Sequence, residues 1–566
     1  MKNKKALRIA TAALLAGVTV GAAQAASAAH PGRSTGASGT ITITDWQFPD
    51  GCNAIATASV ADQEICQPAE DSLFLLDNKL GYQPDLALNI PTTANGEVKI
   101  VGGNSVVSYK FKPNLKFSDG SPITANDFVF SVKVELAEGN AFGLDQITNM
   151  KVVSPQQVDV TYKGTYGPYV AYGNPQPLVS QHYFETKYGT TDIAKIATAN
   201  ATDKYNSPND VFPGAYKIGS YTSGQSMVMV PNPYYTALPA AAGHARPAQI
   251  KFVSIAGDAP GLIAALQSPN SGVDKAEDFQ PSDLPGLNKA TTFKVKLQPA
   301  LFVEHLELNQ GGVLKDVRLR QALQFAIDKV ALYKTLFPAV TNPSDFVLRT
   351  ILPNSSPFLD KSVGISQYNP AKAKALLAAA GYGPGHPLTI RFVTTPSQVR
   401  KNDFAFLKRQ WEAVGINAIA TFPSGSPAAN GGLFSPYSLN GVLTQRRFDV
   451  ALFAFSESAD PQQQEDNFNP AYVPTTAVHG GADQNYAGVT DKDQYALLEK
   501  ARTSIDAGQR RALFNQWQQL TNQRVYFIML YNRSNITLDN GAIGNYSLNP
   551  SNAGNSWNAY QWFRAS

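Results

Sequence analysis

The chain has 566 residues, a formal net charge of +4, 43% apolar residues and 16% charged residues. This length and composition predict several domains with a sizeable core and argue against wholesale disorder. Four basic residues fall within the first eight positions, before any acid, so the rest of the chain is close to neutral. No basic stripe remains, and we expect no nucleic-acid partner.

Residues 1–28 have the pattern of a secretory signal peptide. A basic start is followed by an apolar run over 9–23 and then by small residues, with cleavage expected after Ala25 or Ala28. The apolar run is too short for a membrane anchor. Residues 29–39 are rich in Gly, Ser and Pro, which predicts a flexible leader. No Cys lies near the cleavage site, so we expect export to the periplasm or outside the cell without a lipid anchor.

Two cysteines, Cys52 and Cys66, are present. An even number in an exported chain predicts one disulfide, and two free thiols are the alternative. On the chain-entropy account such a bridge contributes about 3 kcal/mol. Their spacing fits no zinc or redox motif.

The first elements alternate strands and turns. Thr40–Thr44 alternates β-branched residues and predicts a strand. The apolar stretch Asp71–Leu76 predicts a helical segment, and Val106–Phe111 predicts part of a hairpin. Asp119-Gly120 indicates a tight turn. Thr124, with an acid three residues later, indicates the start of a helix.

The region around residue 310 predicts a strand followed by one long helix. Leu301–Leu308 is an apolar run, Gly311-Gly312 is a turn, and Asp316 is placed to cap a helix. One apolar face is expected to contain Leu319, Leu323, Ala326, Val330, Tyr333 and Phe337. Glu304 and Glu307 flank the strand, and we expect both to face solvent.

Later segments predict further α/β units. Residues 368–382 predict a helix ending at Gly381, and Phe448–Phe455 predicts a buried strand of continuous apolar character. Asp491–Leu520 predicts helix, followed by a strand over Val525–Tyr531.

Three strings of the sequence are KFSDGSPITANDFVFS at 116–131, DVRLRQALQFAID at 316–328, and YNPAKAKALLAAAGY at 368–382. Through these strings the chain resembles the family 5 extracellular solute-binding proteins, the dipeptide and oligopeptide receptors of ABC importers. The resemblance runs from about residue 40 to 535. It implies an α/β, two-lobe periplasmic-binding-protein fold of the large, three-subdomain type with a hinged cleft.

The resemblance also implies the domain limits and the partners. Lobe one is expected over 40–300 with a subdomain at about 71–200, lobe two over 301–524, and a return to lobe one over 525–566. A peptide would bind in the cleft, and the receptor, a monomer, would deliver it to the permease subunits of an ABC transporter.

The candidate ligand-binding residues are Trp46, Asn53, Asn309, Phe455, Ser456, Glu457, Ser458 and Asp460. In peptide-binding members of the family, an aromatic residue is followed three positions later by an Asp that pairs with the peptide amine. Here Phe455 takes the aromatic place, but Ser458 stands at the Asp place. Either Glu457 or Asp460 substitutes for that acid, or the solute has no free amine.

The sequence contains no arrangement typical of catalysis. Its six His residues match no metal-binding spacing, and the nucleophile-elbow, Walker A and Rossmann motifs do not occur. We therefore expect no enzyme activity, no metal and no cofactor. A hydrolase stays an alternative because catalytic triads are dispersed in sequence. A sensor without an importer, and an oligosaccharide or modified peptide as solute, also stay open.

Overall fold

The computed structural model describes residues 39–45, 47–53, 55–56, 60–139, 142–475, 483–551 and 554–565. The predicted signal peptide, the leader up to residue 38 and Trp46 lie outside these ranges. Among the described helices, none is both long and apolar enough to cross a membrane.

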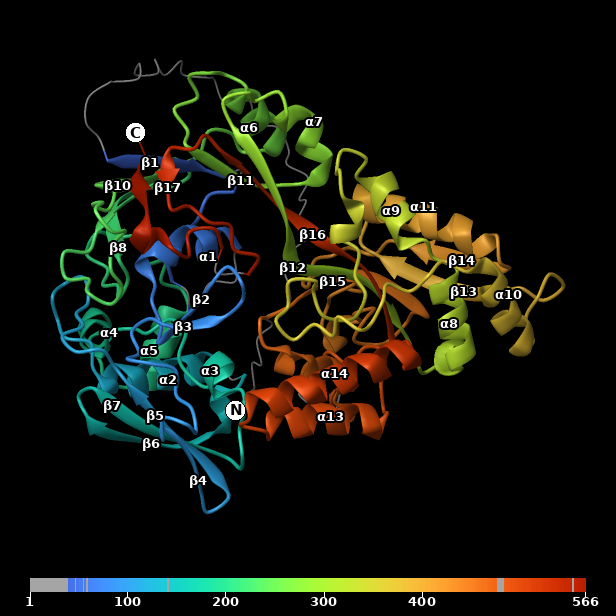
Figure 1. Ribbon diagram of the computed structural model, residues 1–566, viewed down its shortest axis with the longest axis horizontal. Coiled ribbons are helices and arrows are strands. Elements are labelled where there is room, and N and C mark those ends of the chain that lie inside the picture. Colours follow the sequence, from blue (N-terminus) through green and yellow to red (C-terminus); the bar gives the residue numbers. More distant parts are fainter. Residues whose placement is uncertain are drawn as a thin grey trace.

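A mixed sheet of ten strands runs through the molecule from one half to the other (Figure 1). Its strands are β1 (Thr40–Thr44), β8 (Tyr216–Thr222), β9 (Ser226–Pro231), β10 (Gln249–Val253), β11 (Lys275–Phe279), β12 (Lys294–Leu308), β13 (Leu388–Thr394), β14 (Ile416–Thr421), β15 (Val450–Ser456) and β16 (Phe527–Asp539). Their order is β14-β13-β15-β12-β16-β11-β1-β10-β9-β8. The strands β11, β1, β10, β9 and β8 lie on one side of the β12–β16 pair and belong to what we call the first half of the molecule. The strands β15, β13 and β14 lie on the other side and belong to the second half.

The antiparallel strands β12 and β16 pass between the two halves. Lys294–Pro299 pairs with the end of β16 beside β11, whereas Val303–Glu307 pairs with its start beside β15. The register shifts between Pro299 and Val303. Proline has no N–H to donate to a ladder, so this irregular stretch is the natural place for the pair to bend. The lobe limits predicted from the sequence, 300 and 525, stay a prediction.

The first half adds a four-stranded antiparallel sheet, several helices and two short antiparallel strand pairs. The sheet has the order β4 (Val98–Val101), β5 (Asn104–Lys110), β7 (Gln157–Tyr162) and β6 (Ile147–Ser154). The two pairs are the hairpin of β2 (Phe74–Leu76) with β3 (Tyr82–Pro84), and β17 (Ile543–Gly544) with β18 (Phe563–Arg564). The helices are α1 (Val60–Cys66), α2 (Ala125–Glu138), α3 (Tyr169–Tyr172), α4 (Gln181–Tyr188), α5 (Ile193–Asn200), α6 (Ala259–Leu266) and α7 (Leu284–Leu287). One continuous core joins α2 and α4 to both sheets through Tyr109, Phe128 and Phe184.

The second half packs helices on both faces of its strands. They are α8 (Val317–Phe325), α9 (Lys329–Leu336), α10 (Pro370–Ala379), α11 (Gln398–Glu412), α12 (Glu465–Phe468), α13 (Lys492–Arg502) and α14 (Ala507–Arg524). Leu323 and Trp411 belong to the core on one face, and Phe514 and Trp517 to the core on the other. In Figure 1, α13 and α14 lie beside α3 of the first half.

The single long helix predicted after Asp316 is two helices, so that prediction is wrong. α8 begins at the Asp316 cap and ends at Phe325. Asp328 then caps α9, because its carboxylate accepts a hydrogen bond of 2.9 Å from the backbone N–H of Ala331. The break moves Val330 off the buried face, and its side chain is 37% exposed.

Two other predictions about local structure are wrong. The stretch Asp71–Leu76 forms no helix, because Phe74–Leu76 pairs as β2 with β3. Glu304 and Glu307 do not face solvent, since both are buried. Glu304 is paired with arginines, and Glu307 lies 3.3 Å from the buried His305 ring.

Several local predictions are confirmed. The Asp127 carboxylate accepts a 2.8 Å hydrogen bond from the Thr124 backbone N–H at the start of α2. Gly381, just beyond α10, has φ +89°, a conformation that favours glycine. Cys52 and Cys66 are joined by a disulfide, with Cα atoms 5.3 Å apart. Both cysteines lie in the first-half core, where the bridge fixes the end of α1.

Candidate functional site

The candidate site is built around the loop that follows β15. We call Phe455–Asp460 the β15 loop; it includes the last two residues of β15, a strand that is buried except for the half-buried Ser456. Its position is fixed by the neighbouring strand, because the backbone N–H of Glu457 donates a 2.8 Å hydrogen bond to the carbonyl oxygen of Leu301. Leu301 lies in the irregular stretch of β12, so the loop sits where the two halves of the molecule meet.

A cavity of about 60 Å³ opens beside the β15 loop. It is lined by Phe434, Phe453, Ala454, Phe455, Ser456, Glu457, Gln463, Gln464, Asp466, Asn467, Gln484 and Tyr486. Aromatic rings form part of its wall, and carboxyl and amide groups form the rest. No Lys, Arg or His is among these residues. The cavity therefore suits a group that combines an apolar surface with hydrogen-bond donors.

Glu457 is one of the two acids that line this β15 cavity, with Asp466. Its side chain is 5% exposed, and both of its oxygens accept hydrogen bonds from Gln464 Nε2, at 2.8 and 2.7 Å. Burial raises the pKa of Glu457 to about 8, only partly offset by the amide. The adjacent Asn467 donates to Gln464, and its Oδ1 has no partner among the described residues. The cavity thus offers a neutral carboxyl group and an unused acceptor.

Asp460 is already engaged. Its two carboxylate oxygens accept hydrogen bonds from Arg510 of α14 at 2.7 and 2.9 Å, and both side chains are buried. One of these oxygens also accepts from the backbone N–H of Gln462. With a cation and a backbone donor bound, Asp460 has little capacity left for a ligand amine.

Ser458 contacts the other half of the molecule. Its hydroxyl donates to the carbonyl oxygen of Asp460 at 2.7 Å and also contacts the hydroxyl of Tyr172 in α3. Tyr172 lies 2.5 Å from the same Asp460 carbonyl oxygen. The backbone N–H of Gly167 donates to the carbonyl oxygen of Arg502 at 2.6 Å, which is a further contact between the halves. The side chain that replaces the expected Asp is therefore used in a contact between the halves.

Phe455 is largely part of the core. It is stacked on His305, with ring centroids 3.8 Å apart, and it meets Phe453 and Phe527 at their edges. Phe455 also lines the β15 cavity.

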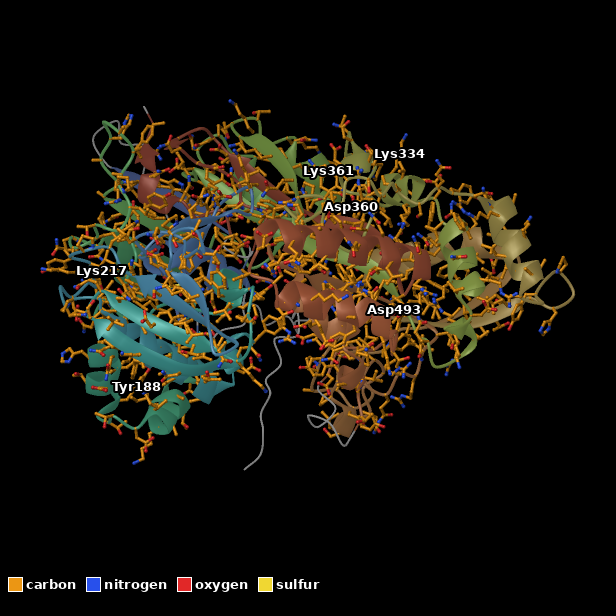
Figure 2. The ribbon with its side chains drawn as sticks, turned by 60° about the horizontal axis from the view of Figure 1, so that its bottom comes forward. Tyr188, Lys217, Lys334, Asp360, Lys361 and Asp493 are labelled. Carbon is orange, nitrogen blue, oxygen red and sulfur yellow. A yellow bond between two sulfur atoms is a disulfide. The ribbon has the colours of Figure 1, made fainter. Side chains whose placement is uncertain are left out.

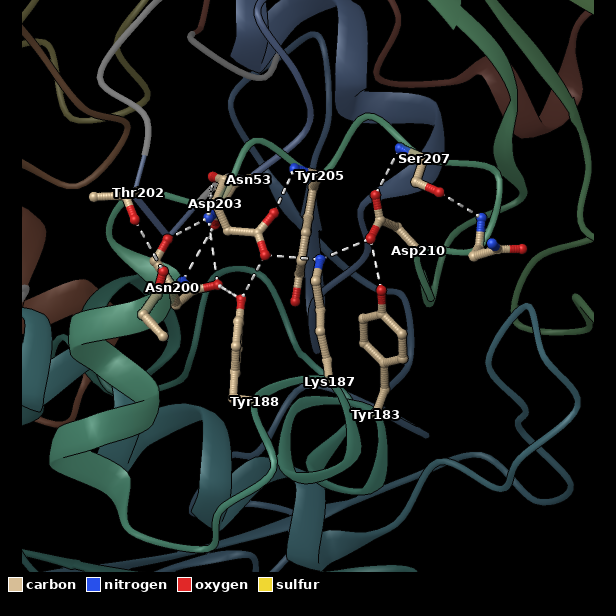
Figure 3. Close-up of polar contacts among 12 residues, drawn as sticks. Asn53, Tyr183, Lys187, Tyr188, Asn200, Thr202, Asp203, Tyr205, Ser207 and Asp210 are labelled. Atoms are coloured by element: carbon tan, nitrogen blue, oxygen red, sulfur yellow. Dashed lines mark hydrogen bonds and ion pairs between the residues drawn. The ribbon is translucent and has the colours of Figure 1, made fainter.

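Asn53 and Asn309 are not brought together with the β15 loop. Asn53 Nδ2 donates to the carbonyl oxygens of Asn200 and Asp203, both at 2.9 Å (Figure 3). In the same group, Lys187 pairs with Asp203 and Asp210 at 2.8 Å each. These contacts hold the segment after Cys52 against α4 and α5.

Asn309 has a comparable structural role at the far end of β12. Its Nδ2 donates to the carbonyl oxygens of Arg446 and Phe448, at 3.0 and 2.7 Å. Its Oδ1 accepts from the Arg446 side chain at 2.6 Å. Ligand contact by Asn53 and Asn309 stays an untested prediction.

Several residues of the site were not among the predicted ligand-binding residues, and four of them carry the polar contacts. Gln464 and Asn467 line the cavity, Arg510 pairs with Asp460, and Tyr172 meets Ser458. Tyr172 ends a stretch with three tyrosines, Tyr166, Tyr169 and Tyr172, which is a signal that the sequence does contain. Nothing in the sequence near Arg510 indicates that it pairs with an acid 50 positions earlier.

The sequence profile of the bacterial extracellular solute-binding proteins, family 5 (middle region), matches residues 81–528. The chain belongs to this family. Among curated relatives, it is 22% identical over 464 residues to the probable deoxycholate-binding periplasmic protein YgiS of Escherichia coli, which covers 80% of this chain and 81% of YgiS. It is 24% identical over 337 residues to the periplasmic oligopeptide-binding protein OppA of Salmonella typhimurium, which covers 55% of this chain and 59% of OppA.

Solved structures share the fold of this family 5 protein. The ABC transporter substrate-binding protein CtaP of Listeria monocytogenes has a TM-score of 0.73 at 19% identity, covering 94% of this chain and 100% of CtaP. The oligopeptide-binding protein of Thermus thermophilus, complexed with a pentapeptide, has a TM-score of 0.66 at 20% identity, covering 93% and 96%. The predicted two-lobe α/β periplasmic-binding fold is thus confirmed.

The buried Glu457 carboxyl group predicts a pH-dependent stability. The pKa of Glu457 in the folded protein lies above its ordinary value of 4.5. The stability that the protonated Glu457 contributes is therefore complete below about pH 4.5. It is lost as the pH rises toward about 8, because the unfolded state releases the proton first. Glutamine does not titrate, so Glu457→Gln should remove this loss. The free energy of unfolding of the variant minus that of the unsubstituted protein should therefore increase by about 2–4 kcal/mol from pH 4.5 to pH 8.

Urea unfolding at half-unit pH steps would measure this difference. Glu499→Gln, on the exposed side of α13, is the matched control and should give a constant difference. If the Glu457→Gln curve runs parallel to that of the unsubstituted protein, Glu457 is ionised in the folded state and the prediction is wrong.

Proposed function

We propose that this protein is an exported receptor that captures a peptide at the β15 cavity and delivers it to the permease of an ABC transporter. Membership of the solute-binding family supports capture of a solute. The relatives' names describe periplasmic binding proteins, which supports export and a binding role in place of catalysis. Within the proposal the receptor acts as a monomer, without a cofactor and without a lipid anchor.

The observation that carries the proposal is the acid in the cavity. Ser458 replaces the family's Asp and Asp460 is bound to Arg510, whereas Glu457 lines the cavity, as Asp466 also does, and its carboxyl group has only an amide as partner. A peptide ammonium entering the cavity would favour the ionised form of Glu457 and form a charge-assisted hydrogen bond with it. The unused Asn467 Oδ1 would accept a hydrogen bond from a second N–H of the same ammonium group.

Calorimetry with a short peptide and its N-acetylated form tests this assignment. Acetylation removes the positive charge, so the free peptide should bind and the acetylated one should not. Glu457→Gln should weaken binding of the free peptide by about 2 kcal/mol or more, because it removes one partner of a buried charged pair. Glu499→Gln, an exposed substitution outside the cavity, should leave binding unchanged.

Equal binding of both peptides would contradict amine recognition. It would favour the second candidate, a receptor for a solute without a free amine, such as an oligosaccharide or a modified peptide. The specific observation behind this candidate is Ser458, whose hydroxyl contacts Tyr172 at the place of the family's amine-binding acid. A transport assay with the proposed ABC transporter permease tests whether the captured solute is imported or only sensed.

A further inference from the structure

A second cavity lies within the second half, between α14, β16 and the start of α9. Its volume is about 10 Å³. It is lined by Gln324, Lys329, Arg349, Thr350, Ile351, Gln518, Thr521, Asn522, Phe527 and Met529. Among these residues two carry positive charge and none carries negative charge. We propose that this cavity is a binding site for a halide ion, with chloride as the physiological occupant.

Lys329 is the first reason. Its side chain is only 4% exposed, and among the described residues its Nζ donates one hydrogen bond, to the carbonyl oxygen of Leu348 at 3.3 Å. An ammonium group has three donors, so two are left without a protein acceptor. A buried cation in this state is costly unless an anion or a polar group compensates it.

Arg349 is the second, independent reason. Its Nε is buried and has no hydrogen-bond partner among the described residues. The nearby amide of Gln518 is already used: its Oε1 accepts from the Thr350 hydroxyl at 2.9 Å and from the backbone N–H of Asp360 at 3.0 Å. The cavity therefore presents unused donors from two cations.

The size of the cavity selects the kind of anion. A space of about 10 Å³ holds one water-sized occupant. A monatomic halide fits such a space with slight adjustment, whereas phosphate, sulfate or a carboxylate has several heavy atoms and does not. Chloride also suits this site because it accepts several N–H groups without requiring a fixed geometry.

The protonation of Lys329 agrees with this assignment. Burial lowers the pKa of Lys329 to about 7, with no acid to oppose it. A bound anion would favour the charged amine, so halide binding should be stronger at pH 6.5 than at pH 8.5. Arg349 is the other titratable side chain among the described residues that line the cavity, and it stays charged at both pH values.

Thermal unfolding in sodium chloride, sodium bromide and sodium gluconate at equal ionic strength tests the site. Chloride and bromide should raise the unfolding temperature of the unsubstituted protein relative to gluconate, and more so at pH 6.5. Lys329→Met and Arg349→Gln should each abolish most of this halide-specific rise, whatever their own stability. Lys334→Met is the matched control: Lys334 is exposed on the same helix (Figure 2) and should keep the full rise.

Crystals grown in bromide provide a direct measurement. An anomalous peak beside Lys329 Nζ and Arg349 Nε is expected in the unsubstituted protein and its loss in Lys329→Met. A water molecule at that place in bromide-grown crystals, or a halide effect on unfolding that Lys329→Met retains in full, would overturn the proposal. Neither result depends on the identity of the solute in the β15 cavity.

Discussion

Glu304→Gln should lower the free energy of unfolding by about 3–5 kcal/mol. The Glu304 carboxylate is buried and accepts hydrogen bonds from Arg533 at 2.7 and 2.9 Å and from Arg400 at 3.3 Å. Arg400 is also buried. Glutamine has no charge to compensate the two guanidinium groups, so at least one buried cation is left without a partner.

The same variant has a defined pH dependence. The two arginines hold the pKa of Glu304 at about 2, below its ordinary value of 4.5, although burial opposes this. For an acid with a lowered folded pKa, the stabilisation is present above about pH 4.5 and is lost as the pH falls toward 2. The stability difference between the variant and the unsubstituted protein should therefore shrink over that range.

Urea unfolding at pH 7, 4.5 and 3 would measure both effects. Glu412→Gln is the control, because Glu412 pairs with Lys408 on the exposed surface of α11. Removing an exposed pair should cost about 0.5 kcal/mol or less. If Glu304→Gln and Glu412→Gln lose the same free energy of unfolding, the charges of Glu304 and its arginines are solvated in the folded protein and the prediction is wrong.

Arg510→Met should also cost about 3–5 kcal/mol, because it leaves the Asp460 carboxylate buried without a cation. The carbonyl oxygen of Asp460 accepts a hydrogen bond from the hydroxyl of Tyr172 in the other half. A shift of Asp460 should therefore also weaken the contact between the halves. Urea unfolding would measure the loss of stability. Small-angle scattering would detect the weaker contact between the halves as a larger radius of gyration.

Two further variants separate the charge from the shape of Arg510. Arg511→Met removes the neighbouring, exposed arginine and should have a small effect. Adding Asp460→Asn to Arg510→Met should restore part of the lost stability, because the asparagine can still accept from Gln462 without carrying an unpaired charge. A double variant less stable than Arg510→Met would show that the charge is not the cause.

Signals that act over a few residues could be predicted from the sequence. The Asp127 and Asp316 caps, the glycine after α10 and the first strand all lie where the sequence indicates them. Each depends on contacts within one turn of chain or on the alternation of one strand. The family resemblance added the two-lobe fold, because the order of many such local motifs is specific to it.

Long-range pairing decided what the local signals left open. Glu304 looked like a surface acid because its partners are 96 and 229 positions away in the chain. Asp460 looked available for an amine because Arg510 is 50 positions away. Asn53 looked like a loop ligand, but its partners are close to residue 200. The identity of a polar residue fixes which partners it can take, whereas only the folded chain decides which partner is within reach.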